Sequence, residues 1–201
     1  AGCPLTDYQI DFTNKKLEEV QSFAFYESNL SSIIFSDSMT SIGQSAFENC
    51  QKLAIGGQAP IIKANVIYSN AFRNCPLVSE IIVSSTSIGK SAFHCDPEKP
   101  TDINEIRQMT TGTAPDLTTL SLTIGPYAFC GRNVKLLGLQ PFSDLTIEEF
   151  AFAKCTFSKT GNKKGYGIQI DNDVDSNNRP IPIVIGQHAF YTADFGTETF
   201  N

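Results

Sequence analysis

The side chains of this 201-residue chain best suited to chemistry are its six cysteines. Cys3 lies near the start, and the others follow an Ala-Phe pair closely, at Cys50, Cys75, Cys95, Cys130 and Cys155. Such recurring thiols fit two structures: buried, reduced core residues, or disulfides between neighbouring repeats of an exported protein, which need Cα atoms within about 7 Å. Zinc binding is not expected, because there is no Cys-x-x-Cys pair and only two histidines.

The two histidines, His94 and His188, each lie beside an Ala-Phe pair. Neither has a serine or cysteine and an acid at a spacing that would indicate a nucleophilic site. We expect both in solvent-facing turns. The residues therefore predict no catalytic site, no enzymatic activity and no cofactor.

Alternating aspartates at Asp171, Asp173 and Asp175 resemble the start of a calcium-binding loop. The full EF-hand pattern fails, because its sixth position holds Ser176 instead of glycine and its twelfth holds Pro182 instead of glutamate. The other interpretation is a polar loop rich in turn-forming residues. Calcium is a weak candidate and the only metal that the sequence indicates.

These residues are positioned by a unit that returns seven times, Ile-Gly-x-x-Ala-Phe in its clearest copies. Its alanines are Ala24, Ala46, Ala71, Ala92, Ala128, Ala151 and Ala189. Four of the steps lie near 23 residues, and the other two are longer by roughly 13 to 15. A unit returning at this interval predicts a stacked solenoid, in which each coil buries its apolar face against its neighbours.

Between the copies lie apolar stretches whose last three positions alternate, as in a half-buried strand. The clearest are Leu30–Phe35, Val78–Val83 and Leu117–Leu122, and weaker forms occur at Leu137–Leu139 and Ile181–Ile185. The third coil, around Leu53–Ile55, lacks the pattern and is expected to be irregular.

Within the unit, each residue type has an expected role. In the copy at 42–50, Ile42 points inward and Gly43 permits a bend or a φ angle that other residues resist. A short helical turn should follow, in which Ala46 packs closely and Phe47 fills the space between coils.

The two long steps predict insertions at 94–116 and 156–180. Within the first, residues 102–109 could form a short helix. Insertions in repeat proteins collect on loops and often build the binding face, so we expect both to contribute to recognition.

A partner-binding patch is expected on the sheet. By alternation, Ile34 and Ile82 point away from the core, beside Ser36, Glu80 and Ser84. An exposed apolar pair at equivalent positions can mark a contact site. Alternatively, another layer or a neighbouring insertion covers both isoleucines.

The pattern Thr-Ser-Ile-Gly-x-x-Ala-Phe-x-x-Cys-x-x-Leu at 40–53 resembles the BspA-type, or Treponema pallidum-type, leucine-rich repeat. The resemblance runs from about residue 3 to residue 192. It implies a curved solenoid with a parallel sheet, in a cell-surface or secreted protein of bacteria or protists that adheres to host matrix proteins or other cells.

We therefore predict one leucine-rich-repeat solenoid over residues 1–201, mainly β with short helical turns, as a fragment or trimmed form of a longer chain. Ala1-Gly2-Cys3 resembles the end of a bacterial lipoprotein signal. The match of Cys3-Pro4-Leu5 with Cys75-Pro76-Leu77 favours the other interpretation, in which the chain begins inside a repeat. A net charge of −6 argues against nucleic acid as a partner, and no apolar run is long enough for a membrane span.

The predicted function is that of a non-enzymatic, adhesin-like module that holds a protein or glycan on its sheet face and inserted loops. The alternative is a structural spacer within a longer surface protein. Exposed solenoid ends also predict end-to-end dimerisation.

Overall fold

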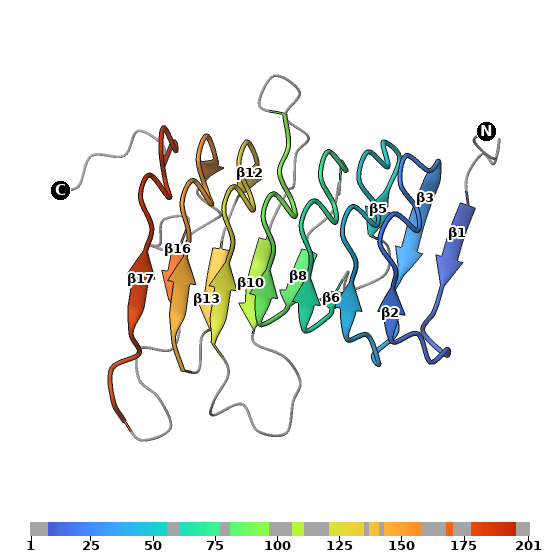
Figure 1. Ribbon diagram of the computed structural model, residues 1–201, viewed down its shortest axis with the longest axis horizontal. Helices are drawn as coiled ribbons and strands as arrows, with labels where there is room; N and C mark the ends of the chain where they lie inside the picture. The colour runs from blue at the N-terminus through green and yellow to red at the C-terminus, as the bar shows by residue number, and fades with distance from the viewer. Residues whose placement is uncertain are drawn as a thin grey trace, which may run out of the picture.

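A computed structural model describes residues 8–55, 61–76, 81–96, 106–110, 121–134, 137–140, 143–157, 168–170 and 178–195. This part of the chain is built from strands and hydrogen-bonded turns and contains no helix. Figure 1 shows the coils stacked side by side along one axis, with the first and last described coils at opposite ends.

The longest sheet has seven parallel strands, one for each copy of the repeat unit. In chain order they are β2 (Glu19–Val20), β4 (Ser41–Ile42), β7 (Val66–Ile67), β9 (Ser87–Ile88), β11 (Leu122–Ile124), β14 (Leu145–Ile147) and β17 (Ile183–Ile185). Each pairs with the equivalent residues of the next coil, so that Ile42 lies beside Val20 and Ile67.

A second column of parallel strands is divided into two sheets. The three-stranded sheet holds β1 (Tyr8–Asp11), β3 (Leu30–Ile34) and β5 (Ala54–Ile55). The five-stranded sheet holds β6 (Ile61–Lys63), β8 (Ile81–Ser84), β10 (Ile106–Thr110), β13 (Leu137–Gln140) and β16 (Ile168–Ile170). A small fourth sheet pairs β12 (Asn133–Val134) with β15 (Thr156–Phe157).

The division falls in the third coil, which was expected to be irregular: β5 ends one sheet there and β6 begins the next. The sequence predicted one parallel sheet, whereas the structure has two strand columns per coil. The stretch at Ile181–Ile185 was expected to be equivalent to Leu30–Phe35, but β3 lies in the second column, whereas β17 pairs with β14 in the seven-stranded sheet.

The helix expected at 102–109 is wrong, because Ile106–Thr110 forms β10, which lies between β8 and β13. The open backbone edges of those two strands supply hydrogen-bond partners that outweigh local helix preference. The predicted strand at Leu117–Leu122 is described only from residue 121. Leu122 begins β11, which belongs to the seven-stranded sheet.

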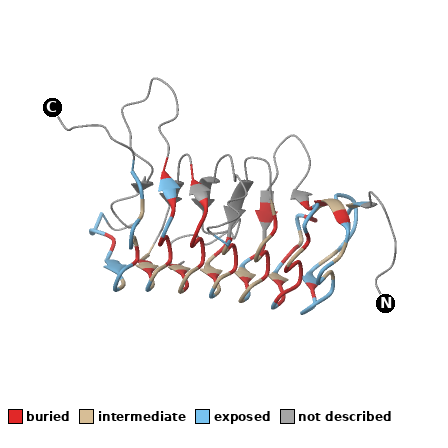
Figure 2. Ribbon diagram, turned by 90° about the horizontal axis from the view of Figure 1, so that it is seen from above, coloured by how far each residue is buried: buried red, intermediate tan, exposed pale blue. Residues whose placement is uncertain are grey.

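The core follows the predicted inward pattern. Leu30, Ile33 and Phe35 of the first clear stretch are all buried. The repeat phenylalanines form one ladder of nearly parallel rings whose centroids are 5.0–5.4 Å apart, from Phe25 through Phe47, Phe72, Phe93, Phe129 and Phe152 to Phe190. Buried positions recur from coil to coil, as Figure 2 shows.

The turn after each short strand is a run of alternating hydrogen bonds. Around Ala46, the N–H groups of Ala46 and Glu48 donate to carbonyls three residues earlier, whereas those of Ser45 and Phe47 donate to the next coil. The residue before the repeat alanine has a positive φ angle in all seven copies: Phe23, Ser45, Asn70, Ser91, Tyr127, Phe150 and His188. Because few of these are residues that favour such angles, the inter-coil bonds hold the turn in this form.

The glycine of the repeat unit is needed not for an unusual φ angle, as predicted, but for a close approach between coils. Gly43 is not among the residues of positive φ, but a Cβ placed on it would lie 2.4 Å from the backbone nitrogen of Ser22 and 2.8 Å from the carbonyl oxygen of Val20. Gly89, Gly125 and Gly186 approach the preceding coil in the same way. Glycine therefore permits close stacking of successive backbones.

We expect Gly43→Ala to lower the free energy of unfolding by about 2–3 kcal/mol, because the atoms it meets are backbone and can move only by separating two coils. The measurement is urea unfolding followed by circular dichroism. The matched control is Tyr68→Ala. Tyr68 is exposed and takes the position of the glycine in its own copy of the unit. The control should change the free energy of unfolding by less than about 0.5 kcal/mol. Equal losses in both variants would contradict this role for glycine.

Candidate interaction surface

The outer face of the seven-stranded sheet carries a row of small, uncharged side chains. We call this row the outer strip; it consists of Ser41, Val66, Ser87, Thr123 and Thr146. All are partly exposed, whereas the residue that follows each one in its strand is buried. Because neighbouring strands lie about 4.8 Å apart, the strip extends for about 20 Å.

Hydroxyl groups beside the outer strip bind backbone instead of projecting outward. Thr40 Oγ1 donates to the Glu18 carbonyl at 2.7 Å, and Thr86 Oγ1 donates to the Asn65 carbonyl at 2.9 Å. Each of these bonds joins a coil to the preceding one. The strip thus lies on a backbone whose neighbouring strands are tied together at its border.

The predicted patch around Ile34 and Ile82 is only partly described. Ile34 is partly exposed at the end of β3, as alternation predicts. Ser36, expected on the surface, is buried instead, and its hydroxyl donates to the Lys15 carbonyl at 2.7 Å. It ties two coils together because the chain turns inward after β3.

The remaining members of that patch lie outside the described part of the chain. This applies to Glu80 as a whole and to the side chains of Ile82 and Ser84, whose backbone belongs to β8. Their proposed role in partner binding stays a prediction.

The described cysteines are all buried, and the thiols of three of them bind backbone. Cys50, Cys75 and Cys155 donate to the carbonyl of the repeat phenylalanine in the preceding coil, at distances of 2.9, 2.9 and 3.1 Å. Burial raises the pKa of Cys155 to about 12 and raises that of Cys75 well above its usual value. A hydrogen bond with Cys75 lowers the pKa of Cys50 to about 7.

All five described cysteines are free thiols, as in the first of the two predicted structures; Cys3 lies outside the described residues. Because Cys75 and Cys155 are protonated at neutral pH and enclosed, their arrangement serves packing and hydrogen bonding between coils.

Arg132 occupies the cysteine position of its coil, and its side chain is fully buried. The guanidinium donates to the carbonyl of Phe93 through Nε, to that of Cys75 at 2.8 Å through Nη1 and to that of Phe72 at 3.5 Å through Nη2. Burial lowers the pKa of Arg132 from its usual value. One cation thereby joins three successive coils.

Arg132 was not among the residues predicted to matter, although the sequence holds a signal for it. In the preceding coil, the cysteine position falls on Asp96, which is exposed where the first insertion begins. The long side chain of Arg132 reaches the carbonyl of Phe72 from the following coil.

The two histidines lie in the turns, as predicted, but in different surroundings. His188 is exposed, stacks on Phe150 at 5.2 Å and meets the ring of Tyr191 edge-on at 5.6 Å. His94 is partly buried, and desolvation together with the nearby positive charge of Arg73 lowers its pKa. Neither has a nucleophile and an acid beside it among the contacts of the described residues.

The three calcium candidates, Asp171, Asp173 and Asp175, lie outside the described residues. In the part of the chain that is described, no three histidine, cysteine or acidic side chains gather in a way that could hold a metal ion. The described residues also include no helix able to cross a bilayer.

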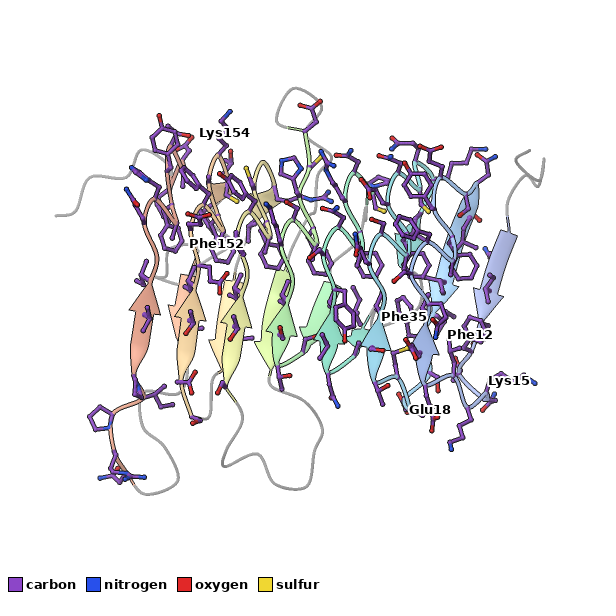
Figure 3. All side chains as sticks on the ribbon, in the orientation of Figure 1. Phe12, Lys15, Glu18, Phe35, Phe152 and Lys154 are labelled. Atoms are coloured by element: carbon purple, nitrogen blue, oxygen red, sulfur yellow. The ribbon has the colours of Figure 1, made fainter. Side chains whose placement is uncertain are left out.

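Ion pairs lie at the border of the coils. Glu48 and Arg73 form an ion pair of 3.3 Å across two adjacent turns, and Lys16 pairs with Glu18 at 2.8 Å in an exposed loop. Figure 3 shows Phe152 within the body of its coil and Lys154, two residues later, pointing away from it.

Comparison with known proteins gives one match. Residues 1–97 match, in six copies, the family described as BspA type Leucine rich repeat region. No curated protein and no solved structure matches the chain significantly. The repeat unit and its strand continue in the structure as far as β17 and Phe190, beyond the matched residues. Over these residues, a little under half of its length, the chain is thus similar to the BspA-type leucine-rich-repeat family.

Proposed function

We propose that this protein is a non-enzymatic, adhesin-like binding module of the cell surface or of a secreted protein, with a protein or glycan partner held on a sheet face and on the adjoining insertions. The family that it resembles is one of repeat scaffolds for protein interaction. The observation that supports the proposal most directly is the outer strip, a flat and uncharged row on five adjacent strands.

Several features of the outer strip suit a partner's surface. Its side chains are short, so a partner can approach the backbone of the sheet, and hydroxyl groups offer hydrogen bonds without the desolvation cost of charges. Val66 adds apolar area to a row that is otherwise of serine and threonine. The parallel strands hold these residues in a rigid row, so little conformational entropy is lost on binding.

The test measures binding of the folded protein to purified host matrix proteins and to an array of host glycans. For a partner found in this way, Ser87→Arg with Thr123→Arg should weaken binding at least tenfold, because two long cations would then stand in the middle of the strip. The charge-matched control is Gln44→Arg with Gln187→Arg, both exposed and both in the turns; it should bind like the wild type.

A second pair of variants separates the strip from the insertions. The structure requires that β10 be kept, so the first insertion should be shortened at 97–105 or 111–120, without removing Ile106–Thr110. Loss of binding only in the shortened variants would place recognition in the insertions. Failure of the folded wild type to bind any member of either panel would overturn the adhesin proposal and favour a structural spacer.

A further inference from the structure

The last described coil presents an open strand edge. In β17, Ile183, Val184 and Ile185 are 45%, 57% and 59% exposed. Their partners Leu145 and Ile147 in β14 are 0% and 2% exposed, because β17 covers them. An apolar edge of this kind is suited to pairing with a further parallel strand.

The first coil of the same sheet is open on the opposite side. Phe23 and Tyr26 are more than two-fifths exposed, and their rings meet edge-on at 5.9 Å. Ala24 is also exposed, whereas the equivalent Ala46 is fully buried by the coil that precedes it.

Hydrogen-bond polarity differs between the two sides. In each turn, alternate N–H groups donate toward the following coil; the N–H of Phe23 binds the Gln44 carbonyl at 3.0 Å, and that of Phe152 binds the Ala189 carbonyl at 2.7 Å. In the turns, the side beyond β17 therefore presents N–H donors and the side before β2 presents carbonyl acceptors. In the strands the polarity is reversed, because the N–H of Gly43 donates to the Val20 carbonyl and that of Gly186 donates to the Ile147 carbonyl, each in the preceding coil. A first coil stacked on a last coil matches both sets of bonds in the register used within the solenoid.

Aromatic side chains reinforce this complementarity. The residues that precede the repeat alanines, all with positive φ angles, form one row along the turns. In this row the rings of Tyr127, Phe150 and His188 form a stack, with centroids 5.0 and 5.2 Å apart. The outer face of His188 ends this stack. The same row begins with Phe23 on the first coil, whereas the three coils between carry small polar residues at Ser45, Asn70 and Ser91. Aromatic rings thus occupy this row toward both ends.

A second turn row shows the same distribution. Its first residue is Tyr26 and its last is Tyr191, both exposed, with polar or small side chains between them. If a first coil stacked on a last coil in the register used within the solenoid, Phe23 would lie over His188, and Tyr26 over Tyr191.

We propose that two copies of this chain associate head to tail, with the coil of β2 (residues 19–28) of one copy stacked on the coil of β17 (residues 183–192) of another. The second copy adds a parallel strand beside β17 and continues the ring stack. The contact joins two different surfaces, so it does not close on itself and extends into chains of copies. It requires no partner for the outer strip and is independent of the proposed binding function.

The test uses two variants, each altered on one side only. The first carries Phe23→Asp with Tyr26→Asp, and the second carries His188→Asp with Tyr191→Asp. All four residues are exposed, and aspartate tolerates the positive φ of Phe23 and His188. Tyr68→Asp, at an exposed aromatic residue in the middle of the solenoid, is the control. Circular dichroism checks that each variant is folded.

Sedimentation velocity of the wild type, from about 1 to about 300 µM, should show a weight-average mass rising from 22.0 kDa to at least twice that value. The Tyr68→Asp variant should behave identically. Each one-sided variant should stay monomeric when alone. An equimolar mixture of the two should form a dimer that grows no further, because each contributes one intact side.

Three results would overturn the proposal. The wild type could remain monomeric over the whole range, or either one-sided variant could still dimerise alone, which would indicate a symmetric contact. The mixture of two folded one-sided variants could also fail to dimerise, in which case the contact uses some other surface.

Discussion

Replacing Arg132 by alanine is expected to lower the free energy of unfolding by about 3–5 kcal/mol. The substitution would remove the Arg132 donor from the carbonyls of Cys75 and Phe93, in a part of the core closed to water. It would also remove one of two donors from the carbonyl of Phe72, which still accepts the N–H of Cys75. Each unsatisfied buried carbonyl costs about 1–3 kcal/mol. Removing the buried cation also relieves its desolvation cost, so the net loss is smaller than the sum of these terms.

Two further variants identify the cause of that loss. Arg132→Cys restores the residue type of the repeat and its bond to the carbonyl of Phe93, so it should lose less stability than Arg132→Ala. Arg73→Ala removes a partly exposed arginine whose ion pair with the largely buried Glu48 joins only two coils; we expect a smaller loss, of about 1 kcal/mol. Urea unfolding monitored by circular dichroism measures all three. A loss near 1 kcal/mol for Arg132→Ala would contradict the joining of three coils by this residue.

We expect Phe93→Ala to cost about 3–5 kcal/mol and to reduce the cooperativity of unfolding. The ring of Phe93 is fully buried between those of Phe72, at 5.2 Å, and Phe129, at 5.0 Å. Truncation removes both stacking contacts and leaves a cavity in the middle of the ladder. Since each coil contacts only its neighbours, a weak central interface lets the two halves unfold separately.

The readout is the shape of the urea transition as well as its midpoint. A lower m-value or two resolved steps should accompany the loss of stability. Tyr68→Ala, an exposed aromatic truncation in the neighbouring coil, should leave both unchanged. A single transition with an unaltered m-value would show that stability is shared over longer distances than nearest neighbours.

Both predictions concern contacts between coils. These contacts could be predicted from the sequence to different degrees. The phenylalanine ladder could be inferred, because one residue type returns at equivalent positions and must stack when the coils stack. Arg132 could not be recognised in this way, because its importance depends on the carbonyl of Phe72, 60 residues away. Only the folded chain shows that the side chain of Arg132 reaches this carbonyl.

The candidate interaction surface, too, could be predicted from the sequence only in part. Alternation placed Ile34 correctly as partly exposed, but it also placed Ser36 on the surface, where the chain in fact turns inward to bind Lys15. The outer strip was missed, although its pattern can be seen in the sequence: a small residue directly before an inward isoleucine, as in Ser41-Ile42 and Ser87-Ile88. Strands of two residues are too short for alternation to show.

By itself the sequence determined the repeat, its length of about 23 residues, its inward side chains and hence a parallel solenoid, because these follow from the local period of apolar residues. The tertiary structure decided what depends on the neighbouring coil. It made Ile106–Thr110 a strand between two others, showed that Gly43 is needed for close approach of the preceding backbone, and aligned the outer strip into one surface. Each of these depends on atoms brought together by stacking, at separations that no local pattern contains.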